Sequence, residues 1–341
     1  MVDAGGMKFQ MKVVITDVID GLPDVEQRIL EGVAEVHVLG ARTEADLVGR
    51  IEDADAVMMY HNVSVRRATI ERLRQCKLIV RCGVGYDNVD HAAAAERGIP
   101  VANVPDYGTE EVADSAIGMM LAMTRGIALL NSRLRDRQLP WFYTQVVPLH
   151  RLRGRVFAIV GLGRIGTAAA HRARALGMDV AFYDPYKPDG YDRAERVRRV
   201  ETLDELLLQA FVLSVHCPST PETRHLIDAA AIARMPRGSY LVNSARGVIV
   251  DSTALPDAIA SGQLAGAAID VLETEPPGDD HPLLRAWRDP LHPAHHRLLL
   301  NPHSAFYSEE GLLDMRTKGA EACRRALLGQ PLRNVVNSPR R

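Results

Sequence analysis

Hydrophobic residues fall into short runs that alternate with amphipathic segments along nearly the whole chain. The early runs are VVIT, EVHVLG, AVMMY, LIVRCG and VANV, and the later ones are VFAIVGLGRIG, DVAFYD, FVLSVHCP, YLVNSARG, GAAIDV and LLLNPHS. Short β-branched runs separated by helical patterns are typical of βαβ units with parallel strands. A long helical pattern separates the two series, so we predict two parallel α/β sheets in succession.

Two helical patterns stand out from the short segments between strands. Residues 110–137 form a continuous pattern rich in Ala, Met and Leu, which either passes from one domain to the other or forms a subunit contact. Residues 308–329 form an amphipathic pattern that begins with Ser308, a favoured N-cap residue, and ends with Gly329. We expect residues 1–10 to be unstructured and the insertion 276–297 to be a solvated loop.

Composition excludes several classes of partner. The 341 residues are 47% hydrophobic, and 41 Lys and Arg nearly balance 43 Asp and Glu, so the chain has no electrostatic footprint for nucleic acid or an anionic membrane. It shows no apolar stretch of membrane-spanning length and no signal-peptide core. The four cysteines lack CxxC spacing and are expected to be reduced thiols. We therefore expect a cytoplasmic protein.

A glycine-rich turn follows the first apolar run of the second series. Gly161, Gly163 and Gly166 have G-x-G-x-x-G spacing between a strand and an Ala-rich helix, which suits a tight turn, a close approach to a pyrophosphate and close packing of helix on strand. Such turns also occur for packing reasons alone. Asp184 ends the next strand, where it either accepts hydrogen bonds from an adenosine ribose or starts a turn before Pro185. Together these features predict a dinucleotide site.

Three polar residues follow later strands: Arg246 in LVNSARGVIVD, Glu275 in AIDVLETEPP and His303 in LLLNPHSA. Taken alone, Arg246 suits a helix-capping charge, Glu275 a solvent-exposed loop carboxylate, and His303 an ordinary loop histidine. Because loops after parallel strands meet at one edge of a sheet, we expect them to converge. Hydride transfer to a 2-keto acid needs a cation for the carboxylate, a proton donor and a group that tunes the donor, which these residue types supply.

Taken in order, these motifs resemble the D-isomer-specific 2-hydroxyacid dehydrogenases, and within them the branch of the C-terminal-binding proteins (CtBP) and their bacterial relatives. The resemblance rests on GLGRIG with Asp184, HCPSTPETRHLI, NSARGVIVD, DVLETEPP and NPHSAFYSEE, and earlier on MYHN, RCGVGYDNVD and NVPDYGTEEVADS. It implies an oxidoreductase in which Arg246 binds the substrate, His303 is the acid/base, and Glu275 holds His303.

The resemblance also implies the binding residues. NAD would contact Gly161, Gly163, Arg164, Ile165, Gly166, Asp184, Cys217, Pro218, Thr223, Ser244, Ala245 and Asp270. The substrate would contact His61, Arg81, Val84, Gly85 and Phe306. No arginine adjoins Asp184, so we expect NAD in preference to NADP. Where many relatives have Arg-Ser this chain has Tyr60-His61, and where the co-repressor relatives have Trp it has Phe306.

The implied architecture is two Rossmann-like or flavodoxin-like doubly wound domains. Residues 1–108 and 306–341 would form a substrate-binding domain, and residues 109–305 an inserted NAD-binding domain that also forms a homodimer contact.

Two other hypotheses concern different classes of protein. A CtBP-like scaffold would sense NAD(H) and bind protein partners instead of turning over a substrate. A metal site at HPAHHR would use His292, His295 and His296, but no carboxylate or cysteine stands at ligand spacing nearby, so we expect no metal.

Overall fold

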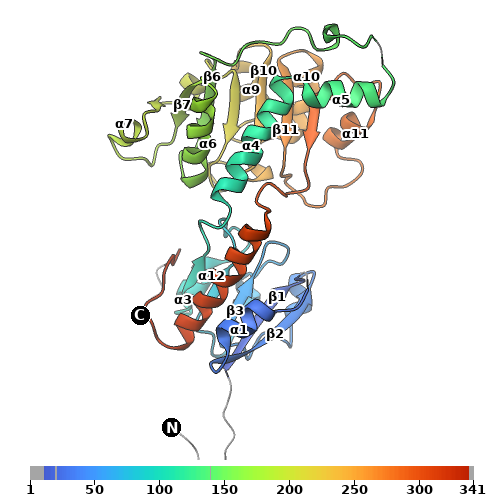
Figure 1. Ribbon diagram of the computed structural model, residues 1–341. Coiled ribbons are helices and arrows are strands. Elements are labelled where there is room, and N and C mark those ends of the chain that lie inside the picture. The colour runs from blue at the N-terminus through green and yellow to red at the C-terminus, as the bar shows by residue number, and fades with distance from the viewer. Residues whose placement is uncertain (1–10, 20, 139, 338–341) are drawn as a thin grey trace, which may run out of the picture. The chain divides into compact units, whose positions relative to one another are not determined.

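The computed structural model describes residues 11–19, 21–138 and 140–337, and the chain divides into two compact units (Figure 1). Unit 1 combines Met1–Gly108 with Ser308–Arg341, and unit 2 is Thr109–Tyr307. Unit 2 is thus inserted in the sequence of unit 1, with its second boundary two residues beyond the expected one. The expectation for residues 1–10 lies outside the described residues.

Unit 1 contains a parallel sheet of five strands in the order β2-β1-β3-β4-β5. This is the flavodoxin-like order. Its elements are β1 (Met11–Asp17), α1 (Asp24–Leu30), β2 (Ala34–Ala41), the 3₁₀ helix η1 (Glu44–Leu47), β3 (Ala56–Met59), α2 (Arg67–Ile70), β4 (Ile79–Arg81), α3 (His91–Glu96), β5 (Val101–Asn103) and α12 (Glu309–Leu327).

Helix α12 returns the end of the chain to this sheet and packs on β3, β4 and α1 (Figure 1). Its start is capped as expected, because the Ser308 hydroxyl accepts from Gly311 N at 2.8 Å. The helix approaches the strands closely at Gly319, where a Cβ atom would lie 2.6 Å from Cys82 Sγ. A glycine is therefore required for this packing.

Unit 2 contains a parallel sheet of seven strands in the order β12-β11-β10-β9-β6-β7-β8. Its elements are α4 (Thr109–Thr124), α5 (Ile127–Arg135), η2 (Tyr143–Val146), β6 (Val156–Val160), α6 (Arg164–Ala175), β7 (Asp179–Tyr183), α7 (Tyr191–Glu195), β8 (Arg198–Arg199), α8 (Leu203–Leu207), β9 (Val212–Val215), α9 (Ala229–Arg234), β10 (Ser239–Asn243), η3 (Gly247–Ile249), η4 (Ser252–Ala254), α10 (Leu255–Ala260), β11 (Leu264–Ile269), α11 (Pro282–Arg288), η5 (His295–Arg297) and β12 (Leu298–Leu300).

Both faces of the second sheet are buried, as parallel sheets require. Helices α4 and α6 cover one face over a core that includes Phe157 and Phe182. Helices α8, α9 and α10 cover the other face over Leu213 and Leu241. Every apolar run named above falls on a strand, and the prediction of two Rossmann-like parallel-sheet domains is confirmed.

The prediction of one helix over 110–137 is wrong. The chain forms α4 and α5 instead, which bend by 62° at Arg125 and Gly126. Gly126 has φ 67, a left-handed conformation, and a Cβ atom there would lie 2.8 Å from Val146 Cγ1. Among the described residues no single helix is long and apolar enough to cross a membrane, although α4 and α5 together pass that length and composition test.

The insertion is more ordered than expected, and one strand was missed. Residues 276–297 include α11, whose Leu283 and Ala286 join the core of unit 2. The helical pattern of α11 was hard to recognise because the insertion has only a few apolar side chains among its Asp, Pro and His residues. Strand β8 consists of Arg198 and Arg199 and carries no apolar signal.

Candidate active site

The candidate residues of unit 2 follow the carboxyl ends of six parallel strands. The glycine loop follows β6, Asp184 follows β7, and Cys217 and Pro218 follow β9. Ser244 to Arg246 follow β10, Asp270 to Glu275 follow β11, and His303 follows β12. Because all these strands run in parallel, the loops lie at one edge of the sheet. Ligands of open α/β sheets bind at this edge, where the strand order reverses.

The strand order reverses between β6 and β9, and the glycine loop fits tightly at this point. Gly161 has φ 89, and a Cβ atom there would lie 2.7 Å from Cys217 Cα. A Cβ atom at Gly166 would collide with the Gly161 carbonyl oxygen, whereas the space next to Gly163 is open. Gly163 caps α6, so Arg164 and Ile165 form its first turn. The loop therefore leaves room for a pyrophosphate at a helix N-terminus.

The Asp184 carboxylate lies next to the glycine loop and also accepts a hydrogen bond from it. Its Oδ2 accepts from Leu162 N at 2.9 Å, and its Oδ1 accepts from Tyr186 N at 3.1 Å. On the other side of the reversal point the Thr223 hydroxyl donates to Pro218 O at 2.7 Å and closes the turn after β9. Asp184 and the Pro218 to Thr223 turn thus border the glycine loop from two neighbouring strands.

The loop after β10 presents Ser244, Ala245 and Arg246, all half-buried. Its organiser is Asn243, which is fully buried: its Oδ1 accepts from Ala245 N and its Nδ2 donates to Arg246 O. Sequence analysis missed Asn243, although a polar residue that ends the apolar run YLVN was a usable signal. The Ser244 hydroxyl is buried and has no hydrogen-bond partner among the described residues, which suits a group that a cofactor would satisfy.

His303 and Glu275 are paired directly. His303 Nδ1 lies 2.6 Å from Glu275 Oε2, and the other carboxylate oxygen accepts from Leu272 N at 2.8 Å. The side chains are 21% and 31% exposed, so both remain accessible to a small ligand. A carboxylate on Nδ1 fixes the tautomer and leaves Nε2 for proton exchange. The Phe306 ring packs edge-on against the His303 ring, and the two ring centroids are 6.2 Å apart.

The backbone of the His303 loop is held in a strained conformation by Asp270. His303 has φ 52, a left-handed value that is uncommon for a non-glycine residue. His303 N donates to Asp270 O, and the Asp270 carboxylate accepts from Ser304 N and Ala305 N. Asp270 is 2% exposed, and its burial raises the pKa of the carboxyl. Its most evident role is therefore to position this loop.

The Arg246 loop touches the Glu275 loop. Gly247 packs against the backbone of Leu272 so closely that a Cβ atom would collide with it. Glu273 ties the same loop to the chain after β9, because it accepts from Arg224 and pairs with His225. Sequence analysis missed Glu273, for which the local pattern carried no signal. Arg246, Glu275 and His303 thus lie on three adjacent loops of unit 2.

Unit 1 presents a different group of candidates at the carboxyl end of β4. Arg81 is 6% exposed, and its Nη1 donates to Cys82 O, next to Gly83, where any Cβ atom would collide with the guanidinium. The half-buried backbone N–H groups of Val84 and Gly85 follow, and within the described part of the chain neither donates a hydrogen bond. Unpaired N–H groups are suitable donors for a carboxylate.

His61 lies in the loop after β3, and a buried carboxylate sets the conformation of that loop. Asp17 is fully buried and accepts from Tyr60 N, Asn62 N and Val63 N. Sequence analysis missed Asp17, although an acid that ends the run VVIT was a signal. Met59, at the end of β3, is fully buried in the core of unit 1 and is therefore no candidate for contact with a substrate side chain. The Tyr60 hydroxyl is buried too.

The cysteines are free thiols, as expected. Burial raises the pKa of Cys82 and of Cys217 to about 12, which makes neither a nucleophile at neutral pH. Next to Cys217, burial lowers the pKa of the His216 imidazole to about 4. Ser214 Oγ lies 2.8 Å from His216 Nε2. These groups act through packing and hydrogen bonding.

Comparison with known proteins identifies the relatives. The family model for the NAD-binding domain of D-isomer-specific 2-hydroxyacid dehydrogenases matches residues 117–305. D-3-phosphoglycerate dehydrogenase of Methanocaldococcus jannaschii is 36% identical over 329 residues, which are 96% of this chain and 60% of that protein. This chain therefore spans less than two thirds of that relative's length.

Solved structures agree over nearly the full chain. A glyoxylate reductase from Paecilomyes thermophila is 27% identical, with a TM-score of 0.83 over 96% of this chain and 99% of the other. D-lactate dehydrogenase from Aquifex aeolicus, solved with NAD and lactic acid, is 26% identical, with a TM-score of 0.81 over 93% of this chain and 96% of the other. The chain belongs to the D-isomer-specific 2-hydroxyacid dehydrogenase family, and its second unit contains the family's NAD-binding domain.

Proposed function

We propose that the chain is an NAD-dependent dehydrogenase that interconverts a 2-keto acid and a D-2-hydroxy acid. The observation that carries this proposal is the 2.6 Å contact between His303 Nδ1 and Glu275 Oε2, at the edge of the sheet that also carries the glycine loop. A general acid must be held by a second group and must stand beside the hydride donor. Two statements stay predictions: that the chain belongs to the CtBP branch of the family, and that the protein is cytoplasmic.

NAD(H) would supply the hydride, and the residues of unit 2 fit it. The open space at Gly163 and the N-terminus of α6 suit the pyrophosphate, and Asp184 suits the adenosine ribose. Ser244 Oγ is a buried hydroxyl that lacks a partner among the described residues, and Ala245 stands beside it. Arg164, Ile165, Gly166, Cys217, Pro218 and Thr223 complete the proposed cofactor contacts.

In the proposed reduction, Arg246 binds the substrate carboxylate and polarises the ketone, because a guanidinium offers paired donors to planar oxygens. His303 would donate a proton from Nε2 to the keto oxygen of the substrate. Glu275 stabilises the imidazolium and keeps the ring oriented. In the reverse direction, neutral His303 takes the hydroxyl proton.

Unit 1 also carries candidate substrate contacts. We propose that the N–H groups of Val84 and Gly85 donate hydrogen bonds to the substrate carboxylate and that Arg81 and His61 contribute to recognition. With Met59 excluded, Phe306 is the main apolar candidate for contact with the substrate side chain, which favours keto acids with apolar substituents. The name of the Methanocaldococcus relative raises the competing case of a phosphorylated substrate.

The direct test is to incubate the protein with NADH and each member of a panel of 2-keto acids, and to measure turnover as the loss of NADH absorbance. The panel holds glyoxylate, pyruvate, longer aliphatic and aromatic keto acids, dicarboxylic acids and phosphohydroxypyruvate. We expect turnover, a D-configured product, and a ranking that Phe306→Ala changes. Failure of the whole panel, together with binding of NADH and protein partners, would favour the scaffold hypothesis instead. If phosphorylated or dicarboxylic acids rank highest and Phe306→Ala leaves the order unchanged, the apolar preference is wrong.

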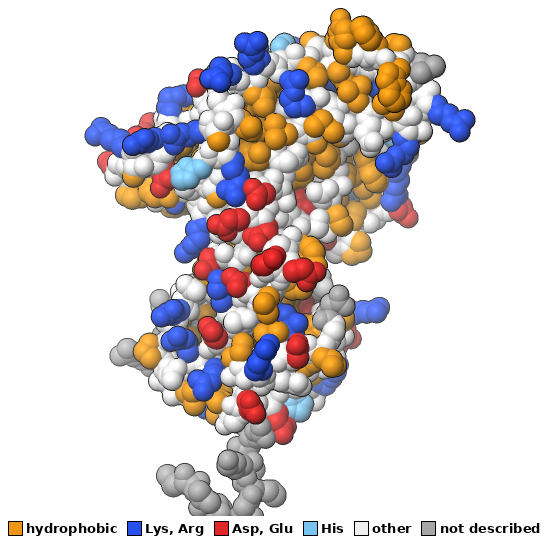
Figure 2. Space-filling model, viewed as in Figure 1, with side chains coloured by type: hydrophobic (Ala, Val, Ile, Leu, Met, Phe, Trp, Pro, Cys, Tyr) orange, Lys and Arg blue, Asp and Glu red, His pale blue; other side chains and the backbone are white. Residues whose placement is uncertain are grey.

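We also propose that the NAD-binding unit forms a homodimer. On the face seen in Figure 2, hydrophobic side chains gather over α4 and α5 of unit 2. The large apolar residues exposed in this part of the chain are Ile127, Trp141, Phe142, Tyr143 and Val147. Exposed apolar patches mark interaction sites in many proteins. Sedimentation velocity should therefore give a dimer, and a Trp141→Asp, Phe142→Asp protein should shift toward monomer.

A further inference from the structure

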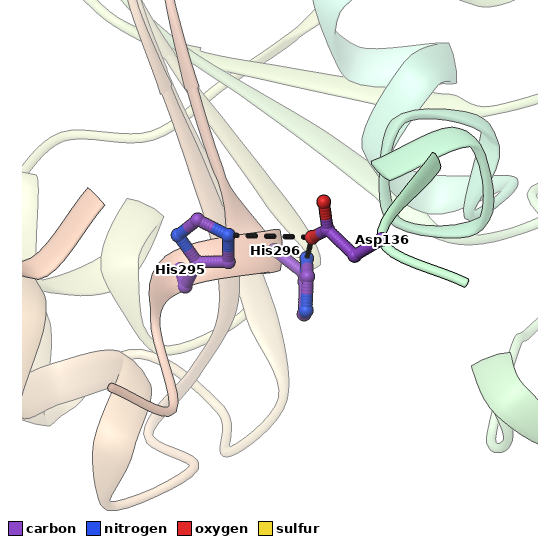
Figure 3. Close-up of side chains that lie close together, drawn as sticks. All are labelled: Asp136, His295 and His296. Atoms are coloured by element: carbon purple, nitrogen blue, oxygen red, sulfur yellow. Dashed lines mark ion pairs between the residues drawn. The ribbon is translucent and has the colours of Figure 1, made fainter. Parts of the chain in front are cut away.

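Three metal-ligating side chains meet in unit 2 outside the candidate active site. Asp136 caps the end of α5, and His295 and His296 form the start of η5, far along the chain. One ligand atom from each lies within 4.8 Å of the others. Figure 3 shows both imidazoles turned toward the Asp136 carboxylate, with His295 Nε2 at 3.7 Å and His296 Nδ1 at 4.0 Å from Oδ2. The carboxylate that the local sequence lacks is thus supplied by a distant helix.

His295 is oriented as a metal ligand by its second ring nitrogen. His295 Nδ1 lies 2.5 Å from the backbone carbonyl oxygen of Trp287, at the end of α11. A carbonyl only accepts, so Nδ1 carries the proton and the neutral ring has its lone pair on Nε2. That atom is the one that faces Asp136. A backbone carbonyl behind a ligating histidine is the usual arrangement for fixing its tautomer.

The His296 ring can also present a lone pair to the site, and this requires only a rotation of neighbouring side chains and no backbone movement. Its Nε2 lies 3.1 Å from the Gln138 side-chain amide, and its Nδ1 lies 2.9 Å from Ser132 Oγ. If the amide turns by half a rotation, its oxygen accepts from Nε2–H and Nδ1 keeps its lone pair. The serine hydroxyl can rotate away.

We propose that Asp136, His295 and His296 bind one divalent transition-metal ion, with Zn²⁺ as the best match. Two imidazoles and one carboxylate are the ligands that zinc prefers, whereas Mg²⁺ and Ca²⁺ prefer all-oxygen sites. Zinc–ligand distances of about 2.0 to 2.2 Å place tetrahedral ligands roughly 3.3 Å apart. The observed separations are slightly longer, so side-chain rotation would close the site around the ion, and water would take the fourth position.

The position of the site indicates a structural role and not a catalytic one. The cluster precedes β12, whereas His303 follows it, so the two lie at opposite ends of that strand. A bound ion would join the end of α5 to the insertion that contains α11 and η5. His296 also borders a cavity of about 460 Å³, and Asp136 is 44% exposed, which gives the ion a route of entry.

The test uses the 341-residue chain without a histidine tag. Titration with ZnCl₂, followed by calorimetry and by metal analysis after dialysis, should give one equivalent bound and a higher melting temperature. Asp136→Asn, His295→Ala and His296→Ala should each weaken binding at least tenfold, since loss of an outer partner alone costs about 10- to 100-fold. MgCl₂ should not bind.

Two matched controls should retain wild-type affinity. His292→Ala removes a histidine of the same insertion that lies outside the cluster. The Nδ1 atom of His292 accepts a hydrogen bond from Ala294 N. His171→Ala removes an exposed histidine that pairs with one carboxylate, Glu195, without a third ligand. Circular dichroism checks that each variant is folded. The proposal is overturned if the wild-type protein binds no stoichiometric zinc, or if the three cluster variants bind it as well as the controls do.

Discussion

Although 28 residues separate them in sequence, His303 and Glu275 lie side by side, with Nδ1 2.6 Å from Oε2. The contact exists because β11 and β12 are adjacent parallel strands, so the loops at their carboxyl ends meet. Asp270, at the end of β11, holds the His303 backbone in its left-handed conformation. Such strain costs of order 1 to 3 kcal/mol and persists where neighbouring contacts enforce it.

Replacing Glu275 by Gln should lower kcat/KM in both reaction directions. Gln keeps the shape of the side chain but removes the charge that faces His303 Nδ1, so the ring loses the carboxylate that orients it. Rates of reduction and of oxidation measured at one fixed pH test this effect, and rates equal to those of the wild-type protein would show that Glu275 does not act on His303.

NADH should be preferred to NADPH by at least about tenfold in kcat/KM, equivalent to about 1.4 kcal/mol. The Asp184 carboxylate is fixed by Leu162 N and Tyr186 N, and a 2′-phosphate beside it would meet a like charge. Asp184→Asn should narrow the gap because the charge is lost while the shape remains. Equal kcat/KM for the two cofactors with the wild-type protein would refute this role.

His216 should make the fold less stable as pH falls from about 6.5 to about 4. Burial lowers its pKa in the folded protein to about 4, so in this interval the unfolded chain binds a proton that the folded chain does not. Unfolding free energy therefore decreases with falling pH, by up to about 3 kcal/mol at 1.36 kcal/mol per pKa unit. Urea unfolding at several pH values measures the slope.

His216→Gln should flatten this slope, because Gln does not titrate. An identical slope in His216→Gln and in the wild-type protein would assign the acid sensitivity to other groups.

The sequence predicted the strands and loops that carry the candidate site, because the relevant signals are local. An apolar run followed by a glycine turn marks β6, and polar residues after β10, β11 and β12 mark Arg246, Glu275 and His303. A parallel sheet then brings those loops to one edge whatever the details of packing.

What sequence analysis missed depends on contacts between distant segments. The helical pattern over 110–137 gave no sign that Gly126 meets Val146 and breaks the helix. Asn243 and Asp17 act through backbone N–H groups of loops whose course is set by the fold. Asp136 meets His295 only because α5 and the insertion lie together, so a search for nearby ligands along the chain misses the cluster.

The most direct test of the account is the activity of His303→Asn. Asn accepts the left-handed conformation seen at position 303, so the loop should stay in place while the acid/base is lost. We predict that reduction of the best keto acid falls by about 10²- to 10⁴-fold while NADH binding, measured by fluorescence titration, changes little. Reduction at close to the wild-type rate by this variant would contradict the central claim that His303 is the proton donor.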